Sequence, residues 1–253
     1  MYNSSINLLL DKFQSISLEE MRAISLMNRI DTKYLTTQKR LLDLLTELLP
    51  HYYVQENNGR RVNLYKTLYY DTIDDFMYLS HHNRRRPREK IRVREYVESD
   101  LSFFEVKNKS NRGRTLKQRS QLTDDINHSD AFIDDFLHQN AQYQLKDLLP
   151  KIQNKFNRIT LVNKNKTERL TVDFDISFKN LTTNSKSSLD NLVVIELKQS
   201  KNVASQGKEI LKSLRILPMS FSKFCIGSSL TNPKLKNNLF KQQLRDINKL
   251  ITS

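Results

Sequence analysis

The 253-residue chain carries 42 Lys and Arg against 28 Asp and Glu, a formal net charge of +14 at pH 7, and 38% of its residues are hydrophobic. These values are typical of a folded chain whose partner is a polyanion, such as nucleic acid, a phosphate-rich ligand or an anionic membrane surface. No run approaches the roughly 20 apolar residues of a membrane-spanning helix, and the four glycines form neither a P-loop nor a G-x-G-x-x-G loop.

The single cysteine, Cys225, rules out an internal disulfide and is typical of a protein from a reducing compartment. Because it stands between Phe224 and Ile226, we expect it to be a small buried side chain. The N-terminus has no Lys or Arg before Leu8, so it lacks the charged region of a signal peptide. We therefore expect a cytoplasmic protein.

The first part of the chain alternates helical and extended patterns. Ser17 and Glu20 form a capping box ahead of an apolar run, which predicts the start of a helix. Thr37 is placed to cap a second helix, whose leucines form an apolar stripe. The predicted elements are a helix at 18–27, a strand at 28–35, a helix at 37–49, one or two strands within 51–70 and a short helix at 72–79.

Positive charge is concentrated in residues 81–119, which hold thirteen Lys or Arg and five Asp or Glu. Side chains alternate between the two faces of a strand, so Arg92 and Arg94 share one face while Ile91 and Val93 share the other. The next predicted strand repeats this arrangement, with Phe103, Glu105 and Lys107 opposite Phe104 and Val106.

The second half of the chain shows no repeat and no linker, so we expect a single domain over 1–253, with a core at about 18–228. Pro150 is expected to end a long helix. The predicted elements are a helix at 124–149, hairpin strands at 156–162 and 169–178, a polar loop at 182–189, a strand at 192–198, a helix at 206–214 and a C-terminal helix at about 233–251.

Several predicted strands carry charged residues on one face and apolar residues on the other. A one-sided antiparallel sheet with its polar face in water would explain this pattern. However, the predicted helices also need an apolar surface to cover, and if they cover the outer faces, the charged faces must point inward. Unpaired charge is too costly for a packed core. The pattern therefore favours a closed barrel with a wet, charged interior that holds a ligand of opposite charge.

The charged residues suit a phosphate ligand, because Arg binds phosphate oxygens in pairs and Lys acts as a point charge. The isolated carboxylates Glu105, Asp173 and Glu196 suggest a divalent metal, since Mg²⁺ usually takes one or two carboxylates together with phosphate oxygens. Pairing with a nearby Arg explains Asp173 equally well, and a salt bridge with Lys198 or with a neighbouring strand is the alternative explanation for Glu196. Such a site could support phosphoryl transfer by positioning and charge neutralisation.

Six short segments, in order and at compatible spacing, together resemble one family. They are R-I-D-T-K-Y from Arg29, Y-Y-D from Tyr69, K-I-R-V-R from Lys90, F-E-V-K from Phe104, V-I-E-L-K from Val194 and F-S-K-F from Phe221. The set resembles the VTC domain, the polyphosphate polymerase branch of the triphosphate tunnel metalloenzymes, over roughly residues 18–228. The resemblance implies an α+β fold, in which an antiparallel eight-stranded closed β-barrel forms a charged tunnel with helices packed on the outside.

The resemblance also implies an activity and a site. Family members lengthen a polyphosphate chain with the terminal phosphoryl group of a nucleoside triphosphate, using a divalent metal such as Mn²⁺ or Mg²⁺. Glu196 corresponds to the metal-binding glutamate and Ser222 to a serine near the phosphates, while Lys198 shares a strand face with Glu196. The basic residues expected at the phosphates are Lys33, Arg92, Arg94, Lys107, Arg158, Arg169 and Lys223.

The chain departs from the family pattern at three positions. Ser220 stands where some members have Lys, Phe156 where some have Tyr, and His81 aligns with an arginine whose charge Arg84 or Arg85 could replace. His81 and His82 lack partner ligands at metal-binding spacing, so we expect them at the surface.

Two other functions are compatible with these residues. Water could replace the acceptor phosphate, which would make the protein a tripolyphosphatase or nucleoside triphosphatase. A non-catalytic polyphosphate- or nucleic-acid-binding module would also need the positive charge. Nucleic-acid binding favours aromatic platforms among the cations, and the charged faces supply mainly Tyr96 and Phe103. We therefore expect nucleoside triphosphate and polyphosphate as ligands, and no nucleic acid; the sequence does not fix the oligomeric state.

Overall fold

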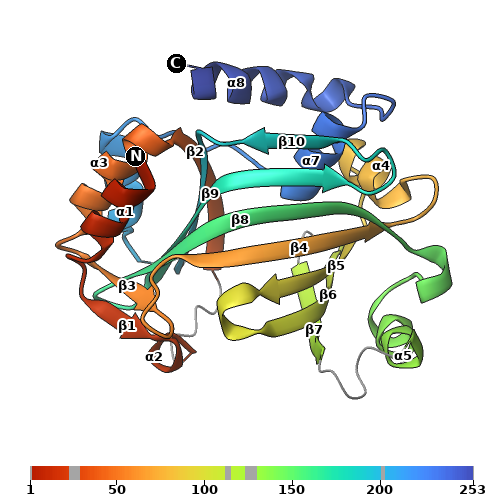
Figure 1. Cartoon of the computed structure of the whole chain (residues 1–253), viewed down its shortest axis with the longest axis horizontal. Helices are drawn as coiled ribbons and strands as arrows, with labels where there is room; N and C mark the ends of the chain where they lie inside the picture. The colour runs from red at the N-terminus through yellow and green to blue at the C-terminus, as the bar shows by residue number, and fades with distance from the viewer. Residues whose placement is uncertain (1, 23–28, 112–114, 123–129, 201–202, 253) are drawn as a thin grey trace.

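The computed structural model describes residues 2–22, 29–111, 115–122, 130–200 and 203–252. A large, strongly curved sheet forms the centre of the molecule, and helices lie against both of its faces (Figure 1). No helix in these ranges is long and apolar enough to cross a membrane.

Eleven strands of the described chain form one sheet. They are β1 (Ser15–Ser17), β2 (Arg29–Thr37), β3 (Tyr52–Glu56), β4 (Asn63–Asp71), β5 (Arg88–Tyr96), β6 (Leu101–Lys109), β7 (Thr115–Leu122), β8 (Leu149–Asn163), β9 (Glu168–Asn180), β10 (Lys186–Leu189) and β11 (Leu192–Ser200). The main path runs β2-β11-β9-β8-β4-β5-β6-β7 with antiparallel neighbours throughout. Off this path, β10 pairs with β9, β3 with β8, and β1 runs parallel to β3.

Eight α-helices lie in the described ranges: α1 (Tyr2–Leu10), α2 (Leu18–Arg22), α3 (Gln38–Leu48), α4 (Phe76–His82), α5 (Asp130–Asn140), α6 (Gln206–Ser213), α7 (Lys223–Thr231) and α8 (Lys241–Thr252). Both predicted helix starts are confirmed. Ser17 and Glu20 exchange the two capping-box hydrogen bonds at 2.9 and 3.2 Å, and Thr37 Oγ1 accepts the Arg40 N–H at 3.4 Å.

The prediction of a closed barrel is wrong, although the α+β class and the antiparallel sheet are confirmed. Among the described residues, β2 and β7, the two ends of the main path, are not hydrogen-bonded to each other. The segment before α7 takes the free edge of β2 instead: Met219 N–H donates to Lys33 O at 2.9 Å, and Tyr34 forms a bridge with Pro218. The sheet is therefore an open, curved trough.

Three predicted helices and one predicted loop differ from the structure. The helix expected at 124–149 is observed only as α5; residues 123–129 lie outside the described part, and Pro150 stands in β8, where the pairing with β4 shifts register. The loop expected at 182–189 contains β10. The helix expected at 72–79 is shifted to α4, and the C-terminal helix begins at α8 rather than near residue 233. Of the helix expected at 18–27, α2 is observed and residues 23–28 lie outside the described part.

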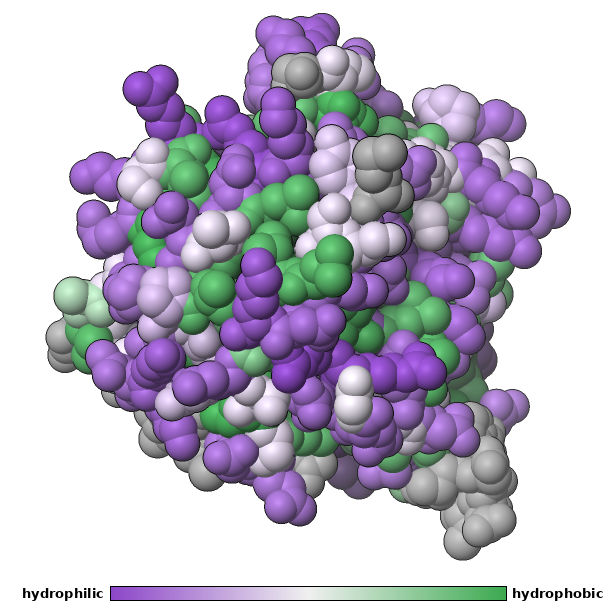
Figure 2. Space-filling model, turned by 60° about the vertical axis from the view of Figure 1, so that its left-hand side comes forward, coloured by the Kyte–Doolittle hydropathy of each residue, from purple (hydrophilic) through white to green (hydrophobic). Residues whose placement is uncertain are grey.

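One hydrophobic core lies between the outer face of the sheet and helices α1, α3 and α6. The predicted stripe of α3 is buried there, with Leu41, Leu45 and Leu48 fully enclosed, and each such side chain contributes about 2 kcal/mol by its burial. On the side of the molecule that carries α1 and α3, hydrophobic residues form separate patches between polar ones (Figure 2). These helices leave the charged faces of the strands pointing into the trough, as predicted.

A second core fills one half of the trough, where α7 packs on the inner face of β8 and β9. The expectation that the helices lie only outside is therefore wrong for α7. Gly227 allows the close approach, since a Cβ there would lie 2.5 Å from the ring of the buried Phe178. The other half of the trough holds the charged side chains.

Candidate active site

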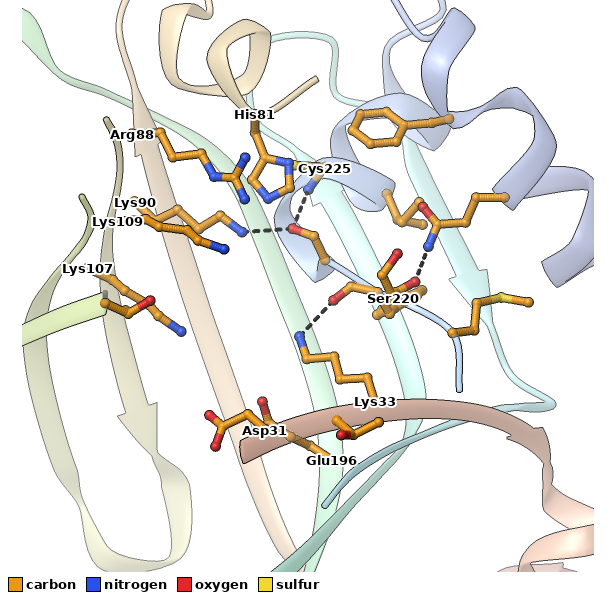
Figure 3. Close-up of a pocket in the computed structure, with 18 of the residues that line it drawn as sticks. Asp31, Lys33, His81, Arg88, Lys90, Lys107, Lys109, Glu196, Ser220 and Cys225 are labelled. Carbon is orange, nitrogen blue, oxygen red and sulfur yellow. Dashed lines mark hydrogen bonds between the residues drawn. The ribbon is translucent and has the colours of Figure 1, made fainter. Parts of the chain in front are cut away.

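One pocket of about 570 Å³ opens on the inner face of the sheet (Figure 3). Its walls come from β2, β5, β6, β7 and β11 and from the segment that leads into α7. Within the described chain, five cationic side chains and two carboxylates line it, so the pocket has an excess of positive charge. The charged lining residues are Lys33, Arg88, Lys90, Lys107, Lys109, Asp31 and Glu196.

Three lysines reach into this pocket from three strands. Lys33 on β2 donates to the carbonyl of Phe221 at 2.7 Å, and Lys90 on β5 donates to Ser222 Oγ at 3.0 Å. Lys107 on β6 stands directly opposite Lys90 in the sheet, and Figure 3 shows all three side chains directed into the same space. Because like charges at opposed strand positions destabilise a sheet, an anion between these lysines would stabilise the folded protein.

The proximity of these cations changes their pKa values. Burial, and repulsion from Lys33 and Arg88, lower the pKa of Lys90 to about 8. Loss of solvent inside the pocket, and repulsion from Lys33 and Lys90, lower the pKa of Lys107 to about 8. Burial, and repulsion from Lys90 and Arg88, lower the pKa of His81 to about 2, so its imidazole is neutral. The crowding of positive charge therefore favours the binding of an anion in the pocket.

We expect the affinity for inorganic tripolyphosphate to fall as the pH rises above about 8. Lys90 and Lys107, with pKa values of about 8 in the free protein, are charged below this pH and lose their protons above it. A bound phosphate favours the charged form, so binding above the free pKa takes up protons, and each lysine weakens the affinity by up to about tenfold per pH unit. Titration calorimetry across this range measures the effect.

The matched control for this pH dependence is the double variant Lys90→Arg/Lys107→Arg, whose side chains stay charged throughout. Its affinity should change little with pH. An equally steep pH profile in the double variant would show that other groups cause the loss.

Two carboxylates meet on one wall of the pocket. Asp31 on β2 and Glu196 on β11 both pair with the ammonium group of Lys198, at 3.1 and 2.7 Å. Burial alone would raise the pKa of Glu196, but Lys198 and Lys33 hold it at about 2. The salt bridge with Lys198 that the sequence suggested is therefore present, and Glu196 is ionised.

Arg92 belongs to a second charged group, on β5, β6 and β7. Its guanidinium contacts Glu105 Oε2 at 2.7 and 2.6 Å, and Lys117 forms an ion pair with the other oxygen. Burial alone would raise the pKa of Glu105, but Arg92 and Arg94 hold it at about 2. Arg92 also donates to the Tyr69 hydroxyl at 3.4 Å. The role of Glu105 in the structure is thus to orient Arg92 and neutralise part of its charge.

Arg158 and Lys223 form a third group around Asp173. Arg158 on β8 donates to the two oxygens of Asp173 on β9 at 2.5 and 2.7 Å, and Lys223 at the start of α7 pairs with the same carboxylate. Burial opposes ionisation of Asp173, but Arg158 and Lys223 keep its pKa well below the ordinary value. Of the two explanations that the sequence allowed for Asp173, the structure shows the ion pair.

The remaining predicted arginines lie on β5 and β9. The guanidinium of Arg94 lies 5.9 Å from the ring centre of Tyr65, and its buried Nε has no hydrogen-bond partner within the described part of the chain. Arg169 stands opposite Lys198 in the sheet.

Of the ten predicted site residues, four line the pocket: Lys33, Lys107, Glu196 and Ser222. The other six are not among its lining residues: Arg92, Arg94, Arg158, Arg169, Lys198 and Lys223.

Helix α7 begins at the pocket. Ser222 is its cap, accepting the Cys225 N–H at 3.3 Å, and both residues line the pocket. The first turn of a helix carries unpaired N–H groups and a positive partial charge, which favour a bound phosphate. Cys225 is buried, as predicted.

The expectation that His81 and His82 lie on the surface is wrong. His81 lines the pocket, where Figure 3 shows its ring beside Arg88. His82 is only 1% exposed, and its Nε2 accepts the Leu239 N–H at 3.2 Å. Both histidines lie at the end of α4, which packs against the segment around Phe240. The sequence alone could not predict this contact between distant segments.

Sequence reasoning missed Asp31, Arg88, Lys90 and Lys109 as site residues. The alternation that selected Arg92 and Arg94 continues backward to Lys90 and Arg88 on the same face of β5, and it continues from Lys107 to Lys109 on β6. The two-residue alternation along these strands was therefore enough to predict Arg88, Lys90 and Lys109 as site residues. The convergence of Asp31 with Glu196 depends on the pairing of β2 with β11.

Comparison with models of protein families identifies the family of this chain. The model of the VTC domain matches residues 28–232, which is most of the sequence. The chain belongs to the VTC domain family. This range of the VTC domain includes all ten predicted site residues, from Lys33 to Lys223. A comparison with curated proteins finds no match.

Several solved structures resemble this VTC domain at low sequence identity. A Hippeastrum protein, described as having a dominant triphosphatase activity, is 14% identical with a TM-score of 0.49, over 81% of this chain and 97% of its own. A Vibrio parahaemolyticus protein, proposed to be an adenylate cyclase, is 10% identical with a TM-score of 0.45, over 78% and 96%. A Pyrococcus horikoshii protein is 12% identical with a TM-score of 0.43, over 79% and 98%. These identities are too low to transfer an activity.

Proposed function

We propose that this VTC domain is a metal-dependent polyphosphate polymerase, which transfers the terminal phosphoryl group of a nucleoside triphosphate to a growing polyphosphate chain. The observation that carries the proposal is the convergence of Lys33, Lys90 and Lys107 with the pair Asp31 and Glu196 in one pocket. Membership of the VTC domain family supports it.

The arrangement of cations along β5 suits an extended phosphate chain rather than a single phosphate. Arg88, Lys90, Arg92 and Arg94 occupy alternate positions of one strand. Alternate residues are about 6.8 Å apart, so the row extends over about 20 Å. A linear polyanion along this row would contact Lys90 in the pocket and reach the arginines next to it.

The residues of the pocket wall suit a divalent metal that the family implies. Asp31 and Glu196 are close enough to share one lysine ammonium, so a cation at that point would replace the ammonium of Lys198. No three His, Cys, Asp or Glu side chains of the described residues form a metal-binding group. A Mg²⁺ or Mn²⁺ ion held by Asp31 and Glu196 would complete its shell with phosphate oxygens and water, and it would neutralise charge on the transferred group.

The residues of the chain then act by position and charge. Lys33, Lys90 and Lys107 reduce the repulsion between the donor triphosphate and the acceptor chain, and the start of α7 adds backbone N–H groups beside Ser222. Phosphoryl transfer between phosphates needs no covalent intermediate with the protein. The neutral His81 contributes no charge at physiological pH.

Incubation of the purified protein with ATP and Mn²⁺, with and without a short polyphosphate primer, tests the proposal. A ladder of lengthening chains on a gel is the expected product, and Arg92→Ala should remove it. Release of free phosphate without a ladder would contradict the polymerase and indicate a hydrolase. Neither product, from protein that still binds polyphosphate, would indicate a binding module.

A further inference from the structure

A second groove, of about 530 Å³, lies on the outer face of the sheet. Its floor is formed by β4, β8, β9 and β10, and Figure 1 shows no helix drawn in front of this part of the sheet. Lys66 and Lys155 line the groove, whereas their chain neighbours Tyr65 and Phe156 point into the trough beside Arg158. The groove and the candidate active site therefore lie on opposite faces of the same strands.

Four lysines line this groove: Lys66, Lys155, Lys179 and Lys186. They form two directly opposed pairs in the sheet, Lys66 with Lys155 and Lys179 with Lys186. Like charges at opposed positions destabilise a sheet. Glu95 compensates Lys66 at 2.9 Å, but no ion pair of the other three is found among the described residues. The groove therefore combines uncompensated positive charge with an uncovered face.

The lining of the groove favours a phosphate chain without bases. Ser177, which stands opposite Lys155 in the sheet, adds a hydroxyl group to the lining between the lysines. Proteins that hold single-stranded nucleic acid stack its bases on exposed aromatic rings. The aromatic residue at this groove, Phe178, is only 2% exposed and packs against α7.

We propose that this outer groove, lined by the four lysines, binds a stretch of inorganic polyphosphate outside the active site. The identification of the ligand as polyphosphate rests on the proposed function, whereas the expectation of an anionic ligand follows from the lysines of the groove alone. Because the two sites lie on opposite faces, a triphosphate cannot contact both at once, and only a chain long enough to pass around the sheet does so. Contact at two sites raises the affinity of a long chain without any change in the pocket.

The test compares a groove variant with a charge-matched control. The groove variant is Lys155→Gln/Lys179→Gln/Lys186→Gln, and the control is Lys39→Gln/Lys208→Gln/Lys212→Gln, which removes the same charge from exposed positions on α3 and α6. Binding of long-chain polyphosphate is measured by fluorescence anisotropy, and binding of tripolyphosphate is measured separately by titration calorimetry. Circular dichroism confirms that both variants are folded.

The groove variant should bind the long chain on the order of tenfold more weakly at low salt, with a salt dependence shallower by about two in log–log slope. Its affinity for tripolyphosphate should be unchanged, and the control should bind like the unmodified protein. Equal weakening in both variants, or no weakening in either, would overturn the groove. Preferential binding of single-stranded RNA over polyphosphate through these lysines would overturn the choice of occupant.

This experiment also separates failure of the groove from failure of the proposed function. If the protein has no polymerase activity, long-chain binding that depends on Lys155, Lys179 and Lys186 would still support the groove. If the polymerase is active and the groove variant binds long-chain polyphosphate with unchanged affinity, the groove proposal alone is wrong.

Discussion

The substitution Glu196→Gln is expected to lower the rate of phosphoryl transfer at least about 100-fold. Removing even a residue that hydrogen-bonds to a metal ligand lowers metal affinity or activity by about 10–100-fold, and Glu196 is expected to bind the metal directly. The glutamine keeps the shape of the side chain but removes its negative charge. Glu196 is ionised and faces Lys33 across the pairing of β2 with β11, so its loss makes the wall more positive. Polyphosphate should therefore bind at least as tightly to the variant, while the ladder of products is lost.

A metal-binding role for Glu196 differs measurably from a purely structural bridge to Lys198. In the first case, the Mn²⁺ concentration for half-maximal activity rises in Glu196→Gln, and high Mn²⁺ restores part of the rate. In the second case, the rate falls with no change in the Mn²⁺ dependence, which would contradict the account. Glu47→Gln on the exposed face of α3 is the control and should behave as the unmodified protein.

The substitution Asp173→Ala is expected to lower the free energy of unfolding by about 3–5 kcal/mol, the usual cost of leaving a buried partner uncompensated. Asp173 is 3% exposed and pairs with both Arg158 and Lys223. Its removal leaves two buried cations without their common anion. Urea denaturation followed by circular dichroism measures the loss, and Asp43→Ala, an exposed position on α3, should change stability by less than about 0.5 kcal/mol.

Phosphate should partly rescue this variant. A polyphosphate chain that extends from the pocket along Arg92 and Arg94 to Arg158 and Lys223 would replace the missing negative charge, and a ligand that binds only the folded state raises stability with its concentration. We therefore expect a larger stabilisation by long-chain polyphosphate in Asp173→Ala than in the unmodified protein. If Asp173→Ala lowers the free energy of unfolding by less than about 1 kcal/mol, Arg158 and Lys223 are solvated rather than dependent on Asp173, and the prediction is wrong.

The faces of the strands could be predicted from the sequence because they follow from local geometry. Alternation along β5 separates Arg92 and Arg94 from Ile91, which is fully buried as expected. The caps at Ser17 and Thr37 are equally local, since each involves atoms three residues apart. These features depend on nearest neighbours along the chain, so one sequence is enough to find them.

The closure of the sheet and the partners of the carboxylates could not be predicted in this way. Whether β2 meets β7 or the segment at Pro218 is a choice between edges that are distant in sequence, and neither edge carries a distinguishing pattern. The pairing of Glu105 with Arg92 depends on the register between β5 and β6, and the pairing of Asp173 with Arg158 on the register between β8 and β9. These registers are set by long-range packing.

A crystal structure of the protein with Mn²⁺ and a non-hydrolysable ATP analogue would test the central claim most directly, with the anomalous signal of manganese to locate the ion. We expect the ion between Asp31 and Glu196, the ammonium of Lys198 displaced, and the triphosphate in contact with Lys33, Lys90 and Lys107. Manganese bound elsewhere, or a triphosphate outside this pocket, would contradict the account.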